Sequence, residues 1–274
     1  MIHPTAIVDR RADLADGVEI GPYAVIEGRV VIGPRTVVGP YTLIKGHAVI
    51  AAGCKLGPGA FIGLDPQHRG YTGAETTVEI GEGCIIREGA SVHRAYQPGH
   101  ATRIGPRCML MGQSHVGHDS VLGADVTLAN CVLLGGHCRI GHGVFLGGGC
   151  GIHQFVRIGR LAIVGGNEAV SRDVPPFAAV RYGGLKGYNA IGCKRAGISR
   201  SSIHAIRGAF HALHTLRTTP AALEAIHDRW GDVPEVRELL EFARANGRGL
   251  QPSYRFARAG STGPASGGDA GDVS

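Results

Sequence analysis

The sequence has few aromatic residues, 5% of 274, and no apolar run that approaches the roughly 20 residues of a membrane-spanning helix. We therefore expect no membrane span. The start, MIHPTAIVDR, has neither the basic nor the apolar segment of a signal peptide, so we expect a cytoplasmic protein. Because rings are scarce, the core must consist mainly of small aliphatic side chains.

The seven cysteines include no CxxC pair, and an odd number argues against a disulfide framework or a zinc knuckle. Glycine, by contrast, is abundant: 45 glycines indicate a backbone that turns often. The net charge of +6 favours an acidic partner and says little more about which one.

A six-residue repeat fills most of the chain before residue 175. Every sixth residue from Ile2 is aliphatic, as in the run Ile20, Ile26, Ile32, Val38, Ile44 and Ile50. The residue four places later is nearly always small, so both positions are expected to point inward. A short strand and a tight turn, repeated three times per coil of about 18 residues, predict a parallel β-helix shaped as a triangular prism.

Two further features fit this prism. Glycines directly after the aliphatic residue, such as Gly21, Gly33 and Gly141, are predicted to supply the special backbone angles of the corners. Five cysteines occupy the small inward position, where a free thiol behaves as a small hydrophobe: Cys54, Cys84, Cys108, Cys138 and Cys150.

The repeat breaks twice, near residues 63–77 and 93–103, where loops leave the coil and are expected to carry function. We predict three parts: a β-helix (1–184), a small C-terminal helical domain (185–256) and a disordered tail (257–274). Within the second part, one helix follows Ser199 and runs to about Arg217, and two others begin near Thr219 and Pro234, the last ending near Asn246.

Histidines cluster in the middle of the prism, at positions 115, 118, 137, 142 and 153. Residues one coil apart stack on the same wall, so His118 is expected over Gly136 and Asp119 over His137. An imidazole base, a backbone amide and a carboxylate in such proximity predict an acyl-transfer site.

Three segments make the prediction more specific: GQSHVGHDSVLG (112–123), LLGGHCRIG (133–141) and GIHQFVRIG (151–159). Together with the opening HPTAIV, the DVPP turn (173–176) and GCKRAGIS (192–199), they resemble the UDP-N-acetylglucosamine 3-O-acyltransferase family of lipid A synthesis. This resemblance extends from Ile2 to about Gly249. It implies a left-handed β-helix, a homotrimer, an acyl carrier protein as donor and a UDP-amino-sugar as acceptor, with no cofactor, metal or nucleic acid.

The resemblance also implies residue roles. His118 would be the general base, Asp119 would orient it, and the N–H of Gly136 would stabilise the oxyanion. Gly166 would limit the acyl chain, and a basic segment would receive the carrier protein: Lys194, Arg195, Arg200 and Arg207. The other substrate-binding residues are expected to be Gln67, His68, His115, His137, His153, Gln154, Asn189 and Arg195.

The chain departs from the family at positions that usually hold the sugar nucleotide: His68 replaces Asp, Gly70 replaces Lys and Ile191 replaces Glu. These changes predict a shifted acceptor, such as another UDP-sugar or one with a 3-amino group. Two alternatives remain at this point. One is a zinc enzyme like the gamma-class carbonic anhydrases, with ligands His115, His137 and His142 split between subunits. The other is a non-catalytic scaffold of the same fold.

Overall fold

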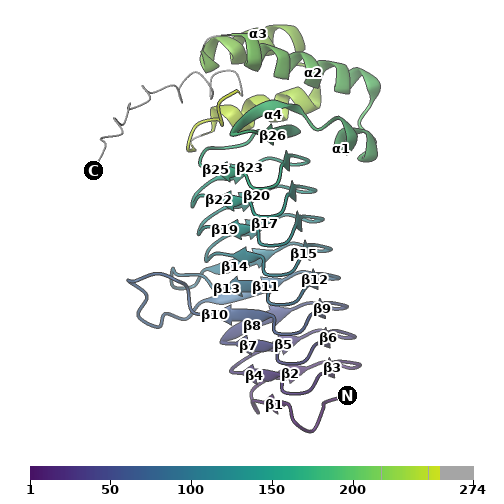
Figure 1. Ribbon diagram of the computed structural model, residues 1–274, viewed down its shortest axis with the longest axis vertical. Coiled ribbons are helices and arrows are strands. Elements are labelled where there is room, and N and C mark those ends of the chain that lie inside the picture. The colour runs from purple at the N-terminus through teal and green to yellow at the C-terminus, as the bar shows by residue number, and fades with distance from the viewer. Residues whose placement is uncertain (217, 246, 254–274) are drawn as a thin grey trace, which may run out of the picture.

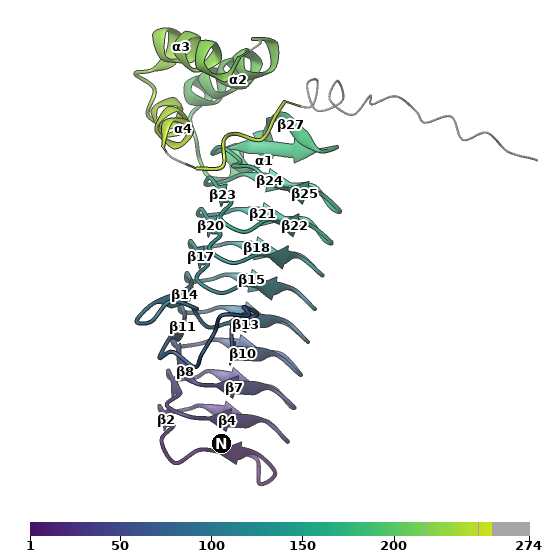
Figure 2. The ribbon, with the colours of Figure 1, turned by 90° about the vertical axis from the view of Figure 1, so that its left-hand side faces the viewer.

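The computed structural model describes residues 1–216, 218–245 and 247–253, and shows an upright prism with helices stacked on one end (Figure 1). The N-terminus lies at the opposite end. Three sheets form the walls of a left-handed parallel β-helix, and each wall receives one short strand from every coil (Figure 2).

The first wall, called the β1 wall, contains nine strands. They are β1 (Ile7–Val8), β4 (Val25–Glu27), β7 (Leu43–Lys45), β10 (Phe61–Leu64), β13 (Ser91–His93), β16 (His115–Val116), β19 (Leu133–Leu134), β22 (Gly151–Ile152) and β25 (Ala169–Val170). The β2 wall contains eight: β2 (Asp13–Leu14), β5 (Val31–Ile32), β8 (His47–Ile50), β11 (Thr77–Ile80), β14 (Ala101–Ile104), β17 (Val121–Leu122), β20 (Arg139–Ile140) and β23 (Arg157–Ile158).

The third wall, the β3 wall, ends in an antiparallel pair and has ten strands. They are β3 (Glu19–Ile20), β6 (Val37–Val38), β9 (Lys55–Leu56), β12 (Ile85–Ile86), β15 (Met109–Leu110), β18 (Thr127–Leu128), β21 (Phe145–Leu146), β24 (Ile163–Val164), β26 (Ala178–Arg181) and β27 (Gly184–Tyr188). Loops 65–76 and 94–100 leave the coil and lie against each other, because Arg94 binds both Asp65 and the Tyr71 hydroxyl.

The aliphatic column fills the prism interior, where its members from Ile20 onward are nearly inaccessible to solvent. The five cysteines of the small inward position are buried and free, as expected of packing residues. Ile2 differs: it is 52% exposed, because no coil lies beneath the first one to cover it.

The corner prediction was wrong in detail. Positive φ angles occur two residues after the predicted glycine, at Arg35 (57°) after Gly33 and at Gly143 (66°) after Gly141. Glycine is required for another reason, since a Cβ on Gly33 would lie 2.7 Å from the backbone N of Ala52 in the next coil. The glycine therefore permits close stacking of coils, and the residue two places after it adopts the positive φ of the turn.

Four helices cover the end of the prism: α1 (Ala190–Arg195), α2 (Arg200–Thr215), α3 (Thr219–Trp230) and α4 (Pro234–Arg244). As predicted, α2 follows a cap at Ser199, whose Oγ accepts a hydrogen bond from the N–H of Ser202. The predicted ends at Arg217 and Asn246, and the tail 257–274, lie outside the described residues. No helix in the described ranges is long and apolar enough to cross a membrane.

Candidate active site

The corner between β16 and β17 holds His118 and Asp119. Asp119 has φ of 59°, a left-handed conformation that aspartate tolerates better than most residues. Its backbone N–H donates a 2.8 Å hydrogen bond to Oγ1 of Thr102 in the preceding coil, which fixes the corner. The turn therefore presents the two side chains in a defined orientation.

His118 and Asp119 form a buried dyad. Nδ1 of His118 lies 2.8 Å from Oδ2 of Asp119, and the backbone N–H of Tyr96 donates to the same oxygen at 2.7 Å. Burial alone would raise the pKa of Asp119, but hydrogen bonds from Tyr96 and His118 outweigh it and hold the pKa below its usual value. An ionised Asp119 favours the His118 tautomer with its proton on Nδ1, which leaves Nε2 able to accept a proton.

Gly136 lies directly against the other edge of the His118 ring. A Cβ built on Gly136 would be 2.7 Å from both Cε1 and Nε2 of His118. The two residues belong to adjacent coils whose strands pair in register, His115 with Leu133. The basic nitrogen therefore faces a stretch of bare backbone, so a reacting group could approach both.

A groove of about 860 Å³ opens along the β1 wall beside this nitrogen. Its lining includes seven of the predicted site residues: Gln67, His68, His115, His118, Gly136, His153 and Gln154. Apolar surface lies in and beside it, since the groove-lining Leu133 is 55% exposed and Phe155, which stacks on His137, is 50% exposed. The arrangement combines a polar centre with apolar flanks, as a site for an acyl chain requires.

The first loop, 65–76, brings His68 over the dyad. The His68 ring lies 4.1 Å from the Tyr96 ring and 5.7 Å from that of His118, measured between centroids. His137, one coil above Asp119, has its ring 5.1 Å from His118 and stacks on Phe155. Both predicted histidines thus border the dyad.

His115 and His93 form a second imidazole pair deeper in the groove. Nδ1 of His115 lies 2.8 Å from Oγ of Ser91, and the ring centroids of His93 and His115 are 4.9 Å apart. Burial lowers the pKa of His115 to about 4 and also lowers that of His93, so both rings are neutral at pH 7. His93 was not predicted as a site residue, although its position directly before the second loop was the available signal.

Three predicted residues lie elsewhere in the chain. Gly166 faces the backbone of Gly148, with a hypothetical Cβ 3.2 Å from its carbonyl oxygen. Asn189 caps α1 and donates through Nδ2 to the carbonyl of Leu161, while Arg195 is exposed at the end of that helix. None of these three lines the groove of its own chain.

The histidines of the zinc alternative do not gather within one chain. His142 instead faces Asp125, with Nδ1 3.4 Å from Oδ2, and His115 faces Ser91. Among the described residues, one group has ligand atoms close enough to hold a metal ion, namely His118, Asp119 and His137. Within one chain, His115, His137 and His142 therefore do not form a zinc site.

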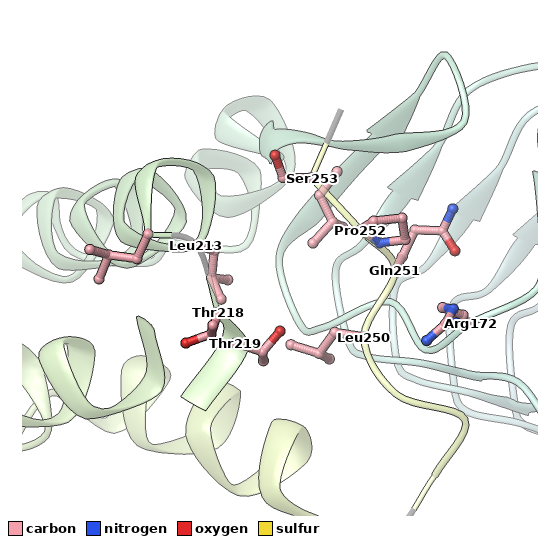
Figure 3. Close-up of a pocket in the computed structure, with 10 residues that line it drawn as sticks. Arg172, Leu213, Thr218, Thr219, Leu250, Gln251, Pro252 and Ser253 are labelled. Carbon is pink, nitrogen blue, oxygen red and sulfur yellow. The ribbon is translucent and has the colours of Figure 1, made fainter. Parts of the chain in front are cut away.

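A second cavity of about 380 Å³ lies where the helices meet segment 250–253 (Figure 3). Leu213, Thr218 and Thr219 line it from the helical side, and Leu250 and Pro252 from the C-terminal segment. Among the described residues that line it, Arg172 alone is titratable. The described residues that line it include no histidine, cysteine or carboxylate, so none of them offers a general base.

Comparison with known proteins gives consistent results. Residues 173–251 match the family described as Udp N-acetylglucosamine O-acyltransferase, Domain 2, and residues 11–46 and 29–63 match the bacterial transferase hexapeptide repeat. The acyl-[acyl-carrier-protein]–UDP-N-acetylglucosamine O-acyltransferase of Halorhodospira halophila is 44% identical over 91% of this chain and 98% of its own length. The protein of the same name from Synechocystis is 42% identical over 57% of this chain and 58% of its own length.

Solved structures of such proteins superpose closely on this chain. LpxA from Acinetobacter baumannii matches with a TM-score of 0.87 and 34% identity, over 91% of this chain and 99% of its own. The UDP-N-acetylglucosamine acyltransferase of Francisella novicida matches with a TM-score of 0.88 and 30% identity, over 94% and 96%. The similarity includes the prism and the helical end.

Proposed function

The chain belongs to the UDP-N-acetylglucosamine O-acyltransferase family, and we propose that it moves a (3-hydroxy)acyl group from acyl carrier protein to the 3-position of UDP-N-acetylglucosamine or a close UDP-amino-sugar, a step of lipid A biosynthesis. The observation that carries this proposal is the buried His118–Asp119 dyad, set against Gly136 in a groove with apolar flanks. The carbonic anhydrase alternative is not favoured, because the relatives are acyltransferases.

His118 starts the reaction as general base. Its Nε2 takes the proton from the acceptor's 3-hydroxyl while that oxygen attacks the carbonyl carbon of the thioester. Asp119 stabilises the imidazolium that forms, and the N–H of Gly136 donates to the oxyanion. When the tetrahedral intermediate collapses, the carbon–sulfur bond breaks and the departing thiolate receives the proton from His118. Atoms and charge balance without a cofactor or a metal.

The groove is completed by a second subunit of a homotrimer in this proposal. Support comes from Gly166, Asn189 and Arg195, which do not reach the groove of their own chain, and from the exposed apolar side chains of Leu133 and Phe155 beside it. Burying these two residues at a subunit contact would remove apolar surface from water.

The acidic carrier protein docks on the basic helical segment. Its four cationic residues are all exposed: Lys194, Arg195, Arg200 and Arg207. Opposite charges on the two surfaces would mainly raise the rate of encounter, and salt would screen that effect. We place the reaction in the cytoplasm.

The test is a transfer assay with a panel of acyl carrier protein thioesters and UDP-sugars that carry either a 3-hydroxyl or a 3-amino group. We expect His118→Ala to lower the transfer rate by about 100- to 10,000-fold, the usual contribution of a general base. His142→Ala is the matched control, because it removes a histidine that also faces an aspartate but lies outside the groove. Full transfer by His118→Ala would refute the role of the base, and binding of both substrates without turnover by the native chain would indicate a scaffold.

A further inference from the structure

Three imidazoles surround the Asp119 carboxylate. Nδ1 of His118 lies 2.8 Å and Nε2 of His137 4.0 Å from Oδ2, while Nδ1 of His100 lies 3.5 Å from Oδ1. One ligand atom from each of His118, Asp119 and His137 can be chosen so that all three lie within 4.8 Å of one another. The proposed transfer reaction uses His118 and Asp119, and it leaves His137 and His100 without a role in proton transfer.

The Asp119 carboxylate is buried and only partly hydrogen-bonded. Asp119 is 5% exposed, and its Oδ1 is a buried oxygen without a hydrogen-bond partner in the described part of the chain. The backbone N–H of Tyr96 also faces the carboxylate, and Arg139 is a permanent cation that acts on His137 from outside the cluster. A buried carboxylate oxygen without a hydrogen-bond partner, surrounded by imidazoles, favours a bound cation.

We propose that His118, Asp119 and His137 form a zinc-binding site, and that zinc held there inhibits the enzyme. Two imidazole nitrogens and one carboxylate oxygen are the ligand types that Zn²⁺ prefers, with water or His100 at the fourth position. Ligand bonds near 2.0–2.1 Å place tetrahedral donors about 3.3 Å apart, so a small opening of the His118–Asp119 pair and a small approach of His137 suffice.

Inhibition follows from the ligand set. Zinc binding at Nδ1 of His118 moves the ring proton from Nδ1 to Nε2, with no net proton released, and it fixes the neutral imidazole as a metal ligand. The ring can then no longer take a proton from the acceptor, and transfer stops until zinc leaves. The inhibition rests on the proposed function of His118, whereas zinc binding itself does not.

Another His–Asp pair of the prism provides the matched control. Asp125 faces His142 at 3.4 Å, but the guanidinium of Arg107 also binds this carboxylate at 2.7 Å and compensates its charge. The pair is half-exposed and has no third ligand nearby in the described residues. It is therefore expected not to hold zinc.

The experiment titrates the full-length, metal-free chain with ZnCl₂ in a calorimeter and repeats the titration with CoCl₂ to record the visible absorption of bound cobalt. We expect one zinc ion per chain and a tetrahedral cobalt spectrum. His137→Asn should weaken binding at least about tenfold, because the left-handed backbone at position 137 (φ 60°) suits asparagine and the removed ring is a ligand. His142→Asn should bind zinc as the native chain does.

The proposed site would be refuted if the native chain bound no zinc at about 0.1 mM, a dissociation constant that corresponds to roughly 5.5 kcal/mol of binding free energy. It would also be refuted if His137→Asn bound zinc as tightly as the native chain, or if His142→Asn lost as much affinity as His137→Asn. Asp119→Asn supplies a second ligand variant should His137→Asn not fold. Transfer should fall with zinc occupancy and recover with EDTA. Because the titration contains no substrate, its outcome is independent of the His118→Ala transfer assay, and either result can fail alone.

Discussion

Gly136 shows how a single residue decides whether the dyad can work. Any side chain there would occupy the space of the His118 ring edge, 2.7 Å from Nε2. The backbone at Gly136 has no positive φ, so alanine is tolerated by the chain itself. A methyl group at this position should therefore displace the imidazole without unfolding the prism.

We expect Gly136→Ala to lower the transfer rate at least about tenfold, since small misplacements of a catalytic group are costly. Its melting temperature should stay close to that of the native chain. Gly151→Ala serves as the stability control, because its added Cβ meets no heavy atom within 4 Å. A Gly136→Ala protein with native transfer rates would show that the ring edge does not face the reaction.

Periodicity predicted which residues share a coil position but not what reaches them from outside the coil. The 18-residue spacing placed His118 beside Gly136, and the structure brings them together. The contacts of Asp119 with Tyr96 and His100 come from the second loop, whose path follows no repeat. The repeat therefore could not predict these two contacts. The roles assigned to the site residues stay predictions.

Asp173 joins two elements that are far apart in the chain, the last coil and the segment after α4. Its carboxylate is fully buried and accepts hydrogen bonds from the guanidinium of Arg157 and the backbone N–H of Arg248. Arg157 in turn lies over the ring of Phe242 and donates to its carbonyl oxygen. This junction attaches the helices to the prism.

We expect Asp173→Asn to lower the free energy of unfolding by roughly 3 kcal/mol, because it leaves the largely buried Arg157 without its anion. Thermal unfolding followed by circular dichroism measures the change. Asp125→Asn removes an exposed partner of Arg107 and should cost below about 1 kcal/mol. Equal losses in the two variants would contradict the importance of the junction.

At the scale of elements, capping residues and prolines correctly predicted where the longer helices begin. Ser199 predicted the start of α2, and Pro234 predicted that of α4. Helix α1 was missed, because its six residues are too short for a periodic apolar pattern. The boundaries proposed for the three parts of the chain remain a prediction.

For the molecule as a whole, buried histidines make stability depend on pH. The folded pKa of His115 is about 4 because burial, and then the charges of His93 and His118, oppose its protonation, while the unfolded value is near 6.5. The folded state therefore binds fewer protons between these values. The stabilisation from a neutral His115 is complete above pH 6.5 and is lost as the pH falls toward 4.

We expect the melting temperature of the native chain to fall between pH 7 and pH 4.5. In His115→Gln the loss of unfolding free energy over this range should be smaller by roughly 1–2 kcal/mol, with allowance for partial exposure of the ring. Urea titrations at several pH values measure the difference. Identical pH slopes for the two proteins would contradict a buried neutral imidazole at position 115.

Coil stacking also restricts how the length of this protein can change. The register that pairs His115 with Leu133 and Leu133 with Gly151 advances by one full coil of 18 residues. A residue inserted within a strand would turn the next inward side chain outward, whereas extra residues at a corner can leave the coil, as loops 65–76 and 94–100 do. An inserted whole coil above β25 would raise the helices by about 4.8 Å and keep all three walls intact. The separation between the dyad and the helical end can thus change only in steps of one coil, by duplication or deletion of entire coils.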